Sequence, residues 1–566
     1  MILDLTSLST DQLRLLHNLS VKIMKDYNLF IEDIYAKTNK KLGWTVNSLF
    51  SRNPYLSDLF INILYLVFIK ETLETNNEIK RIILLDNRIY RTLCKYIKQN
   101  KLNIEVKYSK KSKAVFFYGN VNPFLRNIYI SFQLLLNKKL YNNSKRILGD
   151  EIRLVDIFFD KAMFVNGKFN DKYYHKLLNY FDNSEKSKIY YLPHIMNVNN
   201  LSYFISKSKE VGINVLFKHD YLKLQDYFYA LSMPFRLRFV KEKGFLFKEL
   251  DVKDLIYNDF KKNIFNTSSF YGLLNYRFVM RLKLRNPENI IIFINWFENQ
   301  VIDHGLNKGF NDFFPNLHTK GYQGFVVSLD YNSYLCPTKL EMKLGLLPKE
   351  IFICSKGLQN SIKRYNNDLD VRIAPAFRFE HLWNRDSTEK YKFNSEKYIL
   401  VILPFVYSES IKIINEIVAI ATDCLFERII FKLKFHSDLD KDKLLSLTGK
   451  LPANIKIENG KIEESFNSAT LIIGNTSSAC TEALACGIPV IIIGSRIGLT
   501  QNPIPPEVNK LVWKLVFNKE ELSEAITEFV FSNKLNKETV SEISKEIKEK
   551  YFEPCNREAI RKFLAF

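Results

Sequence analysis

Residues 398 to 494 alternate short apolar runs with segments of helical periodicity, and this alternation strongly constrains the fold. The runs are rich in Ile, Leu and Val at successive positions, which indicates strands buried on both faces. Strands that alternate with helices form a parallel sheet covered by those helices. The predicted strands are 398–405, 428–436, 454–459, 469–475 and 489–494, and the predicted helices are 408–424, 440–449 and 477–486.

A similar but less regular alternation precedes this region. We predict strands at 81–87, 103–108, 188–195, 213–219, 289–297, 324–330, 350–355 and 370–376. Residues 1–78 show helical periodicity, and the charged stretch 384–397 shows none. The sequence therefore predicts a helical N-terminal segment at 1–78 and two Rossmann-like domains at 79–385 and 386–566, the second with terminal helices. Two such domains place ligands in the cleft between them, beyond the carboxyl ends of their strands.

Charge and composition narrow the range of partners and locations. The chain has 82 Lys and Arg against 61 Asp and Glu, a net charge of +21. Such a surface favours nucleic acid, acidic lipid, a nucleotide-activated donor or an anionic glycan, and solvated lysines are the alternative. The seven cysteines form no CxxC pair, which indicates reduced thiols in the cytosol.

The N-terminus carries Asp4 and Asp11, unlike a signal peptide, and the longest apolar stretch, 56–69, is too short to span a bilayer. We therefore expect a cytoplasmic protein that is soluble or peripheral on the inner membrane. Residues 122–146 mix bulky apolar residues with Arg126, Lys138, Lys139, Lys145 and Arg146. This segment either lies in a membrane interface or buries its apolar face against the first domain.

Three hydroxyl residues follow a predicted strand that ends at Gly474. Thr476, Ser477 and Ser478 lie where the predicted strand ends and the predicted helix begins. The free backbone N–H groups of such a turn, with these hydroxyls beside them, suit a phosphate. N-capping of the helix is the simpler alternative. Glu482, one turn into the helix, is placed to reach a ribose hydroxyl or to offset the helix dipole.

A second polar pair ends the predicted strand 428–436. Alternation along a strand puts Lys434 and His436 on one face at the carboxyl edge of the sheet. Both side chains can then point at the same phosphate or base, although a lone His at such a place is more often a surface residue. With the hydroxyl turn on a neighbouring strand, the pair predicts a nucleotide site.

Two polar loops of the first domain are candidates for the reactive and acceptor groups. Glu298 follows the strand 289–297, where a carboxylate facing the cleft can act as general base or nucleophile, and a solvated loop is the alternative. Asn299 and Gln300 follow it directly. Tyr322 and Gln323 precede the predicted strand 324–330, and we expect these four residues to contact substrate if the two strands are neighbours.

Several common site patterns are missing. No GxGxxG follows a strand, and the chain has no GxxxxGK[ST], HExxH or GxSxG. Asp-x-Asp occurs at 368–370 and within 438–442, in charged loops that lack the glycine and closing Glu of a calcium loop. We therefore predict no metal and no cofactor besides an activated donor substrate.

The motifs around the hydroxyl turn resemble those of a known enzyme class. Gly474, Ser477, Ser478, Glu482–Leu484, Gly487 and Pro489–Val490 resemble the Gly-x-x-Ser-Ser...Glu-Ala-Leu-x-x-Gly-x-Pro-Val pattern in the second domain of GT-B glycosyltransferases, which related epimerases share. His436 with Ser477 and Ser478 is similar to the His-Pro and Ser-Ser/Thr pair of bacterial transferases that use CMP-activated acidic sugars. Ser437 stands here in the place of that proline.

Residues 289–510 also resemble bacterial surface-carbohydrate biosynthesis proteins, among them the 3-deoxy-manno-octulosonate (Kdo) and pseudaminic acid transferases. In those proteins an aromatic-Glu-Asn-Gln stretch continues into Trp-Glu, whereas this chain has Val301, Ile302 and Asp303. The resemblance implies a GT-B fold, with two Rossmann-like domains facing a cleft below an N-terminal helical layer. It implies an acceptor domain at 79–385 and a nucleotide-sugar donor domain at 386–566.

The implied activity is transfer of an acidic ulosonic sugar from its CMP donor to a hydroxyl of a bacterial surface glycan, capsule or lipopolysaccharide, with retention and without a metal. The expected partners are the nucleotide sugar, a free or lipid-linked glycan acceptor and a peripheral membrane contact, with no nucleic acid. The enzyme alternative is a UDP-sugar transferase or a 2-epimerase. The non-enzyme alternative is a basic protein that binds nucleic acid or lipid.

Overall fold

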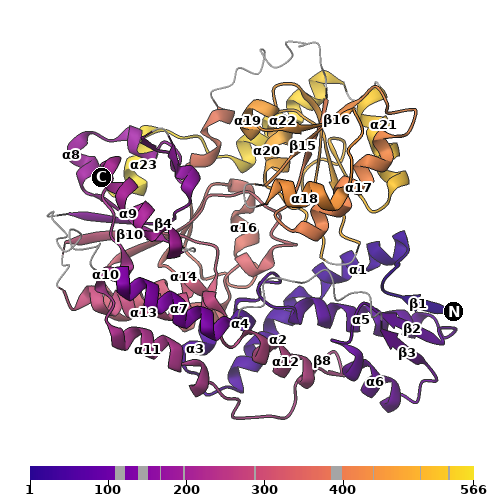
Figure 1. Ribbon diagram of the computed structural model, residues 1–566, viewed down its shortest axis with the longest axis horizontal. Coiled ribbons are helices and arrows are strands. Elements are labelled where there is room, and N and C mark those ends of the chain that lie inside the picture. Colours follow the sequence, from indigo (N-terminus) through magenta and orange to yellow (C-terminus); the bar gives the residue numbers. More distant parts are fainter. Residues whose placement is uncertain are drawn as a thin grey trace.

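The computed structural model covers the whole chain and describes residues 1–108, 122–137, 151–165, 167–195, 198–285, 289–383, 398–436, 439–496, 499–532 and 536–566. Two parallel six-stranded sheets form the centres of two α/β domains, which Figure 1 shows at the left and at the upper right. The predicted boundary stretch 384–397 lies outside the described residues.

The first sheet has the strand order β13-β12-β11-β10-β4-β7, and all its pairings are parallel. Its central strand β10 has the sequence IIIFINW and is almost wholly buried, as expected for a strand covered on both faces. The strands are β4 (Ile152–Phe158), β7 (Ile189–His194), β10 (Ile290–Trp296), β11 (His318–Gln323), β12 (Glu350–Ile353) and β13 (Val371–Ile373).

The second sheet has the strand order β16-β15-β14-β17-β18-β19, again all parallel. Numbered within the domain this is 3-2-1-4-5-6, the Rossmann order. Ile399 and Val401 face one core, whereas Leu400 and Ile402 face a core that continues into the first domain. The strands are β14 (Tyr398–Ile402), β15 (Ile430–Lys434), β16 (Ile455–Glu458), β17 (Ala469–Gly474), β18 (Val490–Ile493) and β19 (Trp513–Val516).

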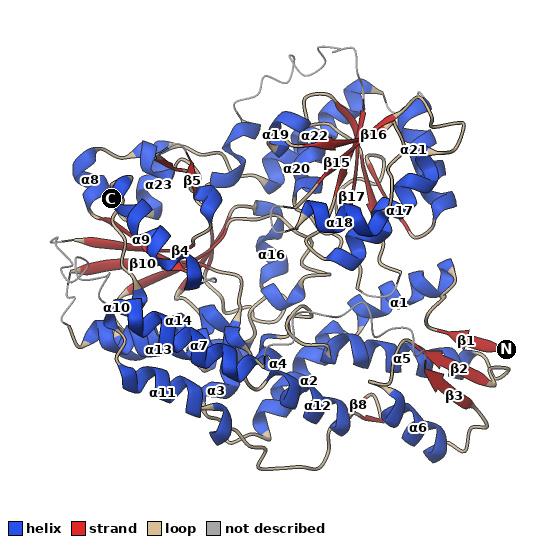
Figure 2. Ribbon diagram, viewed as in Figure 1, coloured by secondary structure: helices blue, strands red, loops and turns tan. Residues whose placement is uncertain are grey.

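The N-terminal part is a helical layer, as predicted, with a small parallel sheet of order β1-β2-β3 beside it (Figure 2). The pairing of β1 with β2 joins residues on either side of the predicted boundary at residue 78. The elements are β1 (Ile2–Asp4), α1 (Thr10–Lys22), α2 (Met24–Ala36), α3 (Leu42–Thr45), α4 (Ser48–Ser51), α5 (Leu59–Thr75), β2 (Arg81–Leu84), α6 (Tyr90–Gln99) and β3 (Glu105–Tyr108).

The helices between β3 and β13 precede or connect the strands of the first sheet. They are α7 (Pro123–Leu136), α8 (Asn183–Ser187), α9 (Leu201–Glu210), α10 (Lys218–Tyr221), α11 (Leu224–Ser232), α12 (Lys253–Asn263), α13 (Thr267–Lys283), α14 (Val301–Phe313), α15 (Lys339–Lys343) and α16 (Gln359–Ile362). Short 3₁₀ turns are η3 (Lys161–Met163), η4 (Leu177–Tyr180), η5 (Val198–Asn200), η6 (Pro234–Arg236), η7 (Ser333–Leu335), η8 (Lys356–Leu358) and η9 (Phe377–Leu382), and two small hairpins are β5 (Phe164–Val165) with β6 (Lys168–Phe169) and β8 (Leu246–Phe247) with β9 (Leu250–Asp251).

The second domain is followed by a helix that returns to the first. Phe563 packs its ring against Tyr322 and Phe352 of the first sheet, and Arg153 donates hydrogen bonds to the carbonyl groups of Leu564 and Ala565. By packing, therefore, α23 is part of the first domain, although the sequence placed it with the second. The helices here are α17 (Tyr407–Ala421), α18 (Lys441–Thr448), α19 (Ile462–Ser465), α20 (Ala479–Ala485), α21 (Lys519–Phe531), α22 (Lys537–Tyr551) and α23 (Arg557–Phe563).

The N-terminal helix α1 lies at the junction of the two domains. The ring of His17 stacks on Tyr331 of the first domain at 4.8 Å and meets Phe517 of the second edge-on at 5.7 Å. Burial lowers the pKa of His17 to about 4, so this imidazole is neutral at pH 7. The junction holds two Rossmann-like domains together, and the predicted GT-B fold class is confirmed.

Several strand predictions need correction. The strand predicted at 324–330 is β11 at His318–Gln323, six residues earlier, and residues 213–219 contribute only an isolated bridge at Val215 before α10. β4 and β19 were not predicted, although both are rich in apolar residues. In the described part of the chain no helix is long and apolar enough to cross a bilayer.

Candidate functional site

A cleft of about 880 Å³ opens between the carboxyl ends of the two sheets. In a doubly wound sheet, ligands bind where the strand order reverses. That point lies between β4 and β10 in the first sheet and between β14 and β17 in the second. Residues that follow β4, β10, β14 and β17 all line the cleft: Ala162, Glu298, Leu403 and Thr476. The topology of both domains therefore directs their ligand sites into one shared space, which is large enough for a nucleotide sugar.

The hydroxyl turn forms the wall of the cleft at the end of β17. Thr476, Ser477 and Ser478 all line it, half-buried. Within the described residues, the backbone N–H groups of these three positions form no hydrogen bond, whereas Ser477 Oγ accepts one from Ala479 N at 3.3 Å. Helix α20 begins at Ala479, later than predicted, and has only seven residues. The turn can therefore offer an anion three N–H groups and the hydroxyls of Thr476 and Ser478.

The predicted pair at the end of β15 also lines the cleft. Lys434 Nζ donates a hydrogen bond to the carbonyl oxygen of Gly460, which holds the ammonium at the cleft wall. His436 is exposed, with its ring 6.0 Å from that of Phe405. Ser437, which replaces the proline of the similar transferases, lies outside the described residues. The structure thus brings Lys434, His436 and the hydroxyl turn together around one space.

Glu482 lies on α20 with only 5% of its surface exposed, yet it lines the cleft. Its Oε1 accepts a hydrogen bond from His381 Nε2 at 2.8 Å. His381 belongs to η9, which follows the last strand of the first sheet. The contact fixes one carboxylate oxygen and ties α20 to the first domain at the back of the cleft.

Glu298 follows β10 on the opposite wall, as predicted, and is half-buried. Trp296 Nε1 donates a hydrogen bond to its Oε1 at 2.8 Å. Burial raises the pKa of Glu298 above its ordinary value, against the hydrogen bond from Trp296 and the positive charge of Arg378. Asp303 Oδ2 accepts hydrogen bonds from the N–H groups of Glu298 and Gln300, both at 3.0 Å, and so fixes the backbone that carries this carboxylate.

Several residues of the first domain that line the cleft were not predicted, among them Arg378 and Asp171. Arg378 follows β13 and lines the cleft beside Glu298; within the described residues it forms no ion pair and no hydrogen bond, only loose contacts with the rings of Trp296 at 6.0 Å and Phe379 at 5.9 Å. Asp171 is buried at the cleft wall, and burial raises its pKa to about 7, against hydrogen bonds from the N–H groups of Tyr173 and Tyr174. Asp171 belongs to none of the motifs named above. Arg378 lies within the resembling stretch 289–510, but no role was predicted for it.

The four predicted substrate contacts beside Glu298 do not line the cleft. Asn299 is fully buried with a left-handed φ of 55°, and its amide hydrogen-bonds to the Tyr334 carbonyl at 3.1 Å and to the imidazole of His304 at 3.2 Å. Gln300 donates to the Glu298 carbonyl at 2.9 Å and accepts from Asn53 at 2.7 Å.

Tyr322 and Gln323 belong to β11, so both are enclosed by neighbouring strands and loops. The Tyr322 hydroxyl donates to the Pro375 carbonyl at 2.8 Å, and Gln323 Nε2 donates to the Leu335 carbonyl at 3.2 Å. The side chains of these four residues therefore support the wall behind Glu298, and their expected contacts with substrate stay predictions.

A scan against protein-family models and a search of curated proteins found no match. Among solved structures, the chain is similar to S. aureus MnaA in a co-structure with UDP, at 12% identity over 73% of this chain and 95% of that one, with a TM-score of 0.43. UDP-GlcNAc 2-epimerase from Neisseria meningitidis bound to UDP-GlcNAc shares 11% identity over 73% and 99%, with a TM-score of 0.42. Acinetobacter baumannii MurG shares 10% over 73% and 98%, with a TM-score of 0.37. Similarities this distant identify neither a family nor a substrate.

Proposed function

We propose that the protein is a glycosyltransferase that moves an acidic ulosonic sugar, of the pseudaminic acid or Kdo type, from a CMP donor to a hydroxyl of a bacterial surface glycan. The first support is the anion site on the donor wall. Three free N–H groups, the hydroxyls of Thr476 and Ser478 and the ammonium of Lys434 suit a nucleotide phosphate. Glu482 would accept from the ribose hydroxyls through its second oxygen.

The single observation that supports an acidic donor sugar is the position of Arg378 in the cleft. Its guanidinium forms no ion pair with any residue that the structure describes, and it lines the same cleft as the proposed phosphate site, beside Glu298. A bidentate hydrogen bond to a carboxylate is the interaction that this group forms best. An ulosonic sugar carries one carboxylate next to the carbon that is transferred, whereas a neutral sugar offers Arg378 no anion.

In the proposed reaction the acceptor oxygen bonds to the anomeric carbon, and the bond from that carbon to the phosphate oxygen breaks. CMP leaves as a phosphate monoester, and the anion site stabilises its charge. Glu298 is our candidate to take the acceptor proton or to act as nucleophile, and its raised pKa brings a general base closer to neutral pH. Metal independence and retention of configuration stay predictions.

A UDP-sugar transferase or 2-epimerase is the second candidate. An epimerase must remove a proton from carbon and return one, and the cleft wall holds two carboxyl groups with raised pKa values, Glu298 and Asp171. Glu482 would serve a uridine ribose as well as a cytidine ribose. This candidate requires uridine nucleotides to bind more tightly than cytidine nucleotides.

The test is a calorimetric titration with CMP, CDP and UDP, followed by incubation with CMP-ulosonic acids and acceptor glycans read by mass spectrometry, with and without EDTA. Tightest binding of CMP and transfer of the sugar would support the proposal. Preference for UDP, with exchange of solvent deuterium into UDP-GlcNAc, would support the epimerase. Salt-sensitive binding of RNA without any nucleotide binding would leave only the non-enzyme alternative.

A further inference from the structure

Helix α7 turns polar side chains toward the protein and bulky apolar side chains toward solvent. The stripe that faces the protein holds Asn127, Ile130, Ser131 and Leu134, two of them polar. Asn127 Nδ2 donates to the Phe265 carbonyl at 2.9 Å, and Ser131 Oγ donates to the Asn127 carbonyl at 2.8 Å. The outward stripe is apolar instead: Leu125, Ile128, Tyr129, Phe132 and Leu136. A helix that only packs on a domain turns its apolar stripe inward, so this outward stripe needs another explanation.

Helix α11, which packs beside α7, repeats the reversal. It buries Asp226, whose carboxylate pairs with Arg277 and Arg281, and it exposes Leu224 and Phe228. Phe235 of η6 is 69% exposed and joins the two helices, because its ring lies 5.8 Å from that of Phe124. We call the outward side chains of α7, α11 and η6 the apolar face: Leu125, Ile128, Tyr129, Phe132, Leu136, Leu224, Phe228 and Phe235.

Exposed cations accompany the apolar face along the chain. Arg126 lies on α7, and Arg236, Arg238, Lys241 and Lys243 follow Phe235 in the sequence. Arg236 donates to the Ser232 hydroxyl at 3.0 Å, and within the described residues none of the five has a carboxylate partner. Glu242, the one acid in residues 235–243, pairs with Lys253 at 3.5 Å, and α7 carries no acid at all. Among the described residues, α7 and the segment 235–243 therefore carry an excess of positive charge.

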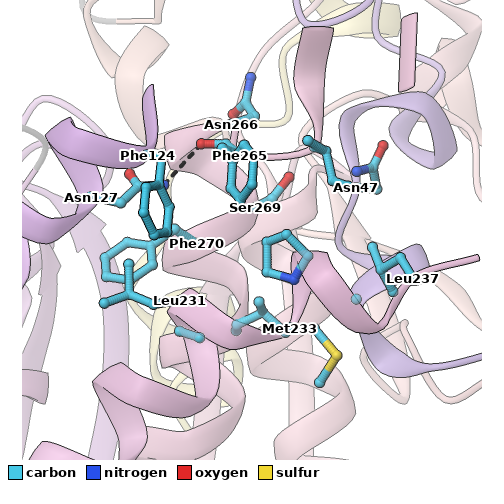
Figure 3. A pocket seen from close by; sticks show the side chains of 15 residues that line it. Asn47, Phe124, Asn127, Leu231, Met233, Leu237, Phe265, Asn266, Ser269 and Phe270 are labelled. Carbon is cyan, nitrogen blue, oxygen red and sulfur yellow. Dashed lines mark hydrogen bonds between the residues drawn. The ribbon is translucent and has the colours of Figure 1, made fainter. Parts of the chain in front are cut away.

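Figure 3 shows what lies beneath this surface. Phe124 and Asn127 of α7 meet Leu231, Met233 and Phe265 around a crevice between α7, η6 and α13, and the dashed line marks the bond from Asn127 to Phe265. The free space is only about 10 Å³, enough for about one water molecule and far too little for an acyl chain. Any contact with lipid would therefore be made by the exposed side chains and not inside this crevice.

We infer that the apolar face is a docking surface for an anionic lipid membrane. Bulky aromatic and aliphatic side chains on a helix that lies in the interface, accompanied by exposed Arg and Lys, match the chemistry of an anionic bilayer surface, where apolar groups enter the acyl boundary and cations meet the headgroups. In Figure 1, α7 and α11 lie at the lower left, away from the second sheet, so docking there leaves that domain clear of the membrane. Lys138, Lys139, Lys145 and Arg146, which follow α7, lie outside the described residues.

The test is co-sedimentation of the full chain with phosphatidylcholine vesicles and with vesicles that also contain phosphatidylglycerol. We expect binding to the anionic vesicles that falls as salt rises. The double variant Leu125→Glu/Phe132→Glu should lower the partition coefficient at least tenfold. In the unaltered chain both apolar side chains leave water on binding, and this favourable transfer is lost in the variant. Arg236→Gln/Arg238→Gln should lower it roughly fivefold per charge on anionic vesicles only.

Matched controls come from the second domain and from distant cations. Leu447→Glu changes a residue as exposed as Leu125, both at 58%, and Lys80→Gln/Lys545→Gln removes two exposed charges elsewhere. These variants should bind as the unaltered chain does, and circular dichroism should show all of them folded, because each change is at the surface.

Three results would overturn the inference: no binding to anionic vesicles, equal loss in the Leu447→Glu control, or unaltered binding by Leu125→Glu/Phe132→Glu. A dimer in sedimentation velocity that this double variant dissociates, without vesicle binding, would instead assign the apolar face to a protein partner. The assay contains neither donor nor acceptor, so its outcome is independent of the proposed transfer reaction.

Discussion

His381 and Glu482 stand 101 residues apart in the sequence and are joined by a hydrogen bond of 2.8 Å. One residue follows the last strand of the first sheet and the other lies on the helix after the hydroxyl turn. A nucleotide that engages Glu482 would therefore contact a group whose position depends on both domains. The position of the Glu482 carboxylate in the cleft therefore depends on how the two domains are arranged.

Glu482→Gln should weaken CMP binding by roughly 10- to 100-fold, because a charged acceptor for the ribose hydroxyls is lost. The unaltered chain should accordingly prefer CMP over 2′-deoxy-CMP, and the variant should lose that preference. Calorimetric titration with both nucleotides measures it. An unaltered chain that binds both equally would show that Glu482 serves the fold and not the ribose, and the melting temperature of the variant reports any loss of stability.

Arg378→Met should raise the KM for a CMP-ulosonic donor by roughly 10- to 100-fold, since a bidentate pair with the sugar carboxylate is removed. The affinity for CMP alone should stay within about twofold because CMP lacks that carboxylate. Arg378→Lys is the matched variant and should recover part of the loss. Equal weakening of CMP and donor would instead place Arg378 at the phosphate.

Ser478→Ala should lower the affinity for CMP by roughly three- to tenfold and leave cytidine binding unchanged, because cytidine has no phosphate. Ser478 is a sharper choice than Ser477, whose hydroxyl already accepts from Ala479 N and whose loss would also remove a cap. Ser541→Ala, at an exposed position on α22, is the control. If cytidine binding fell in parallel, the turn would contact the nucleoside and the anion site would lie elsewhere.

Burial raises the pKa of Asp303 to about 8, against the hydrogen bonds from backbone N–H groups and with added repulsion from Asp156. Its unfolded pKa is about 3.9, so between about pH 4 and 8 the folded chain holds a proton that the unfolded chain releases. The free energy of unfolding should therefore fall by up to about 1.4 kcal/mol per pH unit from this group as pH rises.

Asp303→Asn, which keeps an oxygen acceptor without titrating, should remove that slope in urea unfolding measured from pH 5 to 7.5. The difference in unfolding free energy between the unaltered chain and this variant would then decline across the range. A flat difference for Asp303→Asn would mean that its carboxyl group has the same pKa in the folded and the unfolded chain.

The parts of the site that sequence predicted rest on local chemistry. Ser477 and Ser478 follow an apolar strand directly, and the alternation along β15 correctly placed Lys434 at the carboxyl edge. Glu298 was found in the same way, as the first charged residue after β10. Each of these signals lies within a few residues of a strand end, where the physical reason for the position is local.

The missed features depend on distant partners. β11 reads HTKGYQ, too polar for a buried strand by pattern alone, but Lys320 Nζ donates to the carbonyl of Phe563, 243 residues away, at 2.8 Å. Tyr322 and Gln323 are satisfied by carbonyl groups of other loops. Arg378 lies in η9, after the edge strand β13, and lines the cleft together with residues of the other domain. No spacing in the sequence reports such partners.

Removal of residues 557–566 should destabilise the first domain by on the order of 5 kcal/mol, because Ile560, Phe563 and Leu564 are buried against it. Urea unfolding followed by Trp fluorescence measures the loss. Truncation that left the midpoint unchanged would show that α23 is not part of the first domain. The more conservative Arg153→Met, which removes the bonds to Leu564 and Ala565, should show a smaller shift in the same direction.

The packing of α23 on the first sheet also means that the first domain cannot be completed until the whole chain has been translated. The last strand of that sheet ends at Ile373, yet the side chains of α23 that cover Tyr322 and Phe352 are translated only after the entire second domain. At ordinary translation rates that interval lasts roughly 10 to 40 seconds. During this time the apolar surface of the first domain that α23 later covers stays exposed at the ribosome. A chaperone can therefore bind this surface before α23 is synthesised.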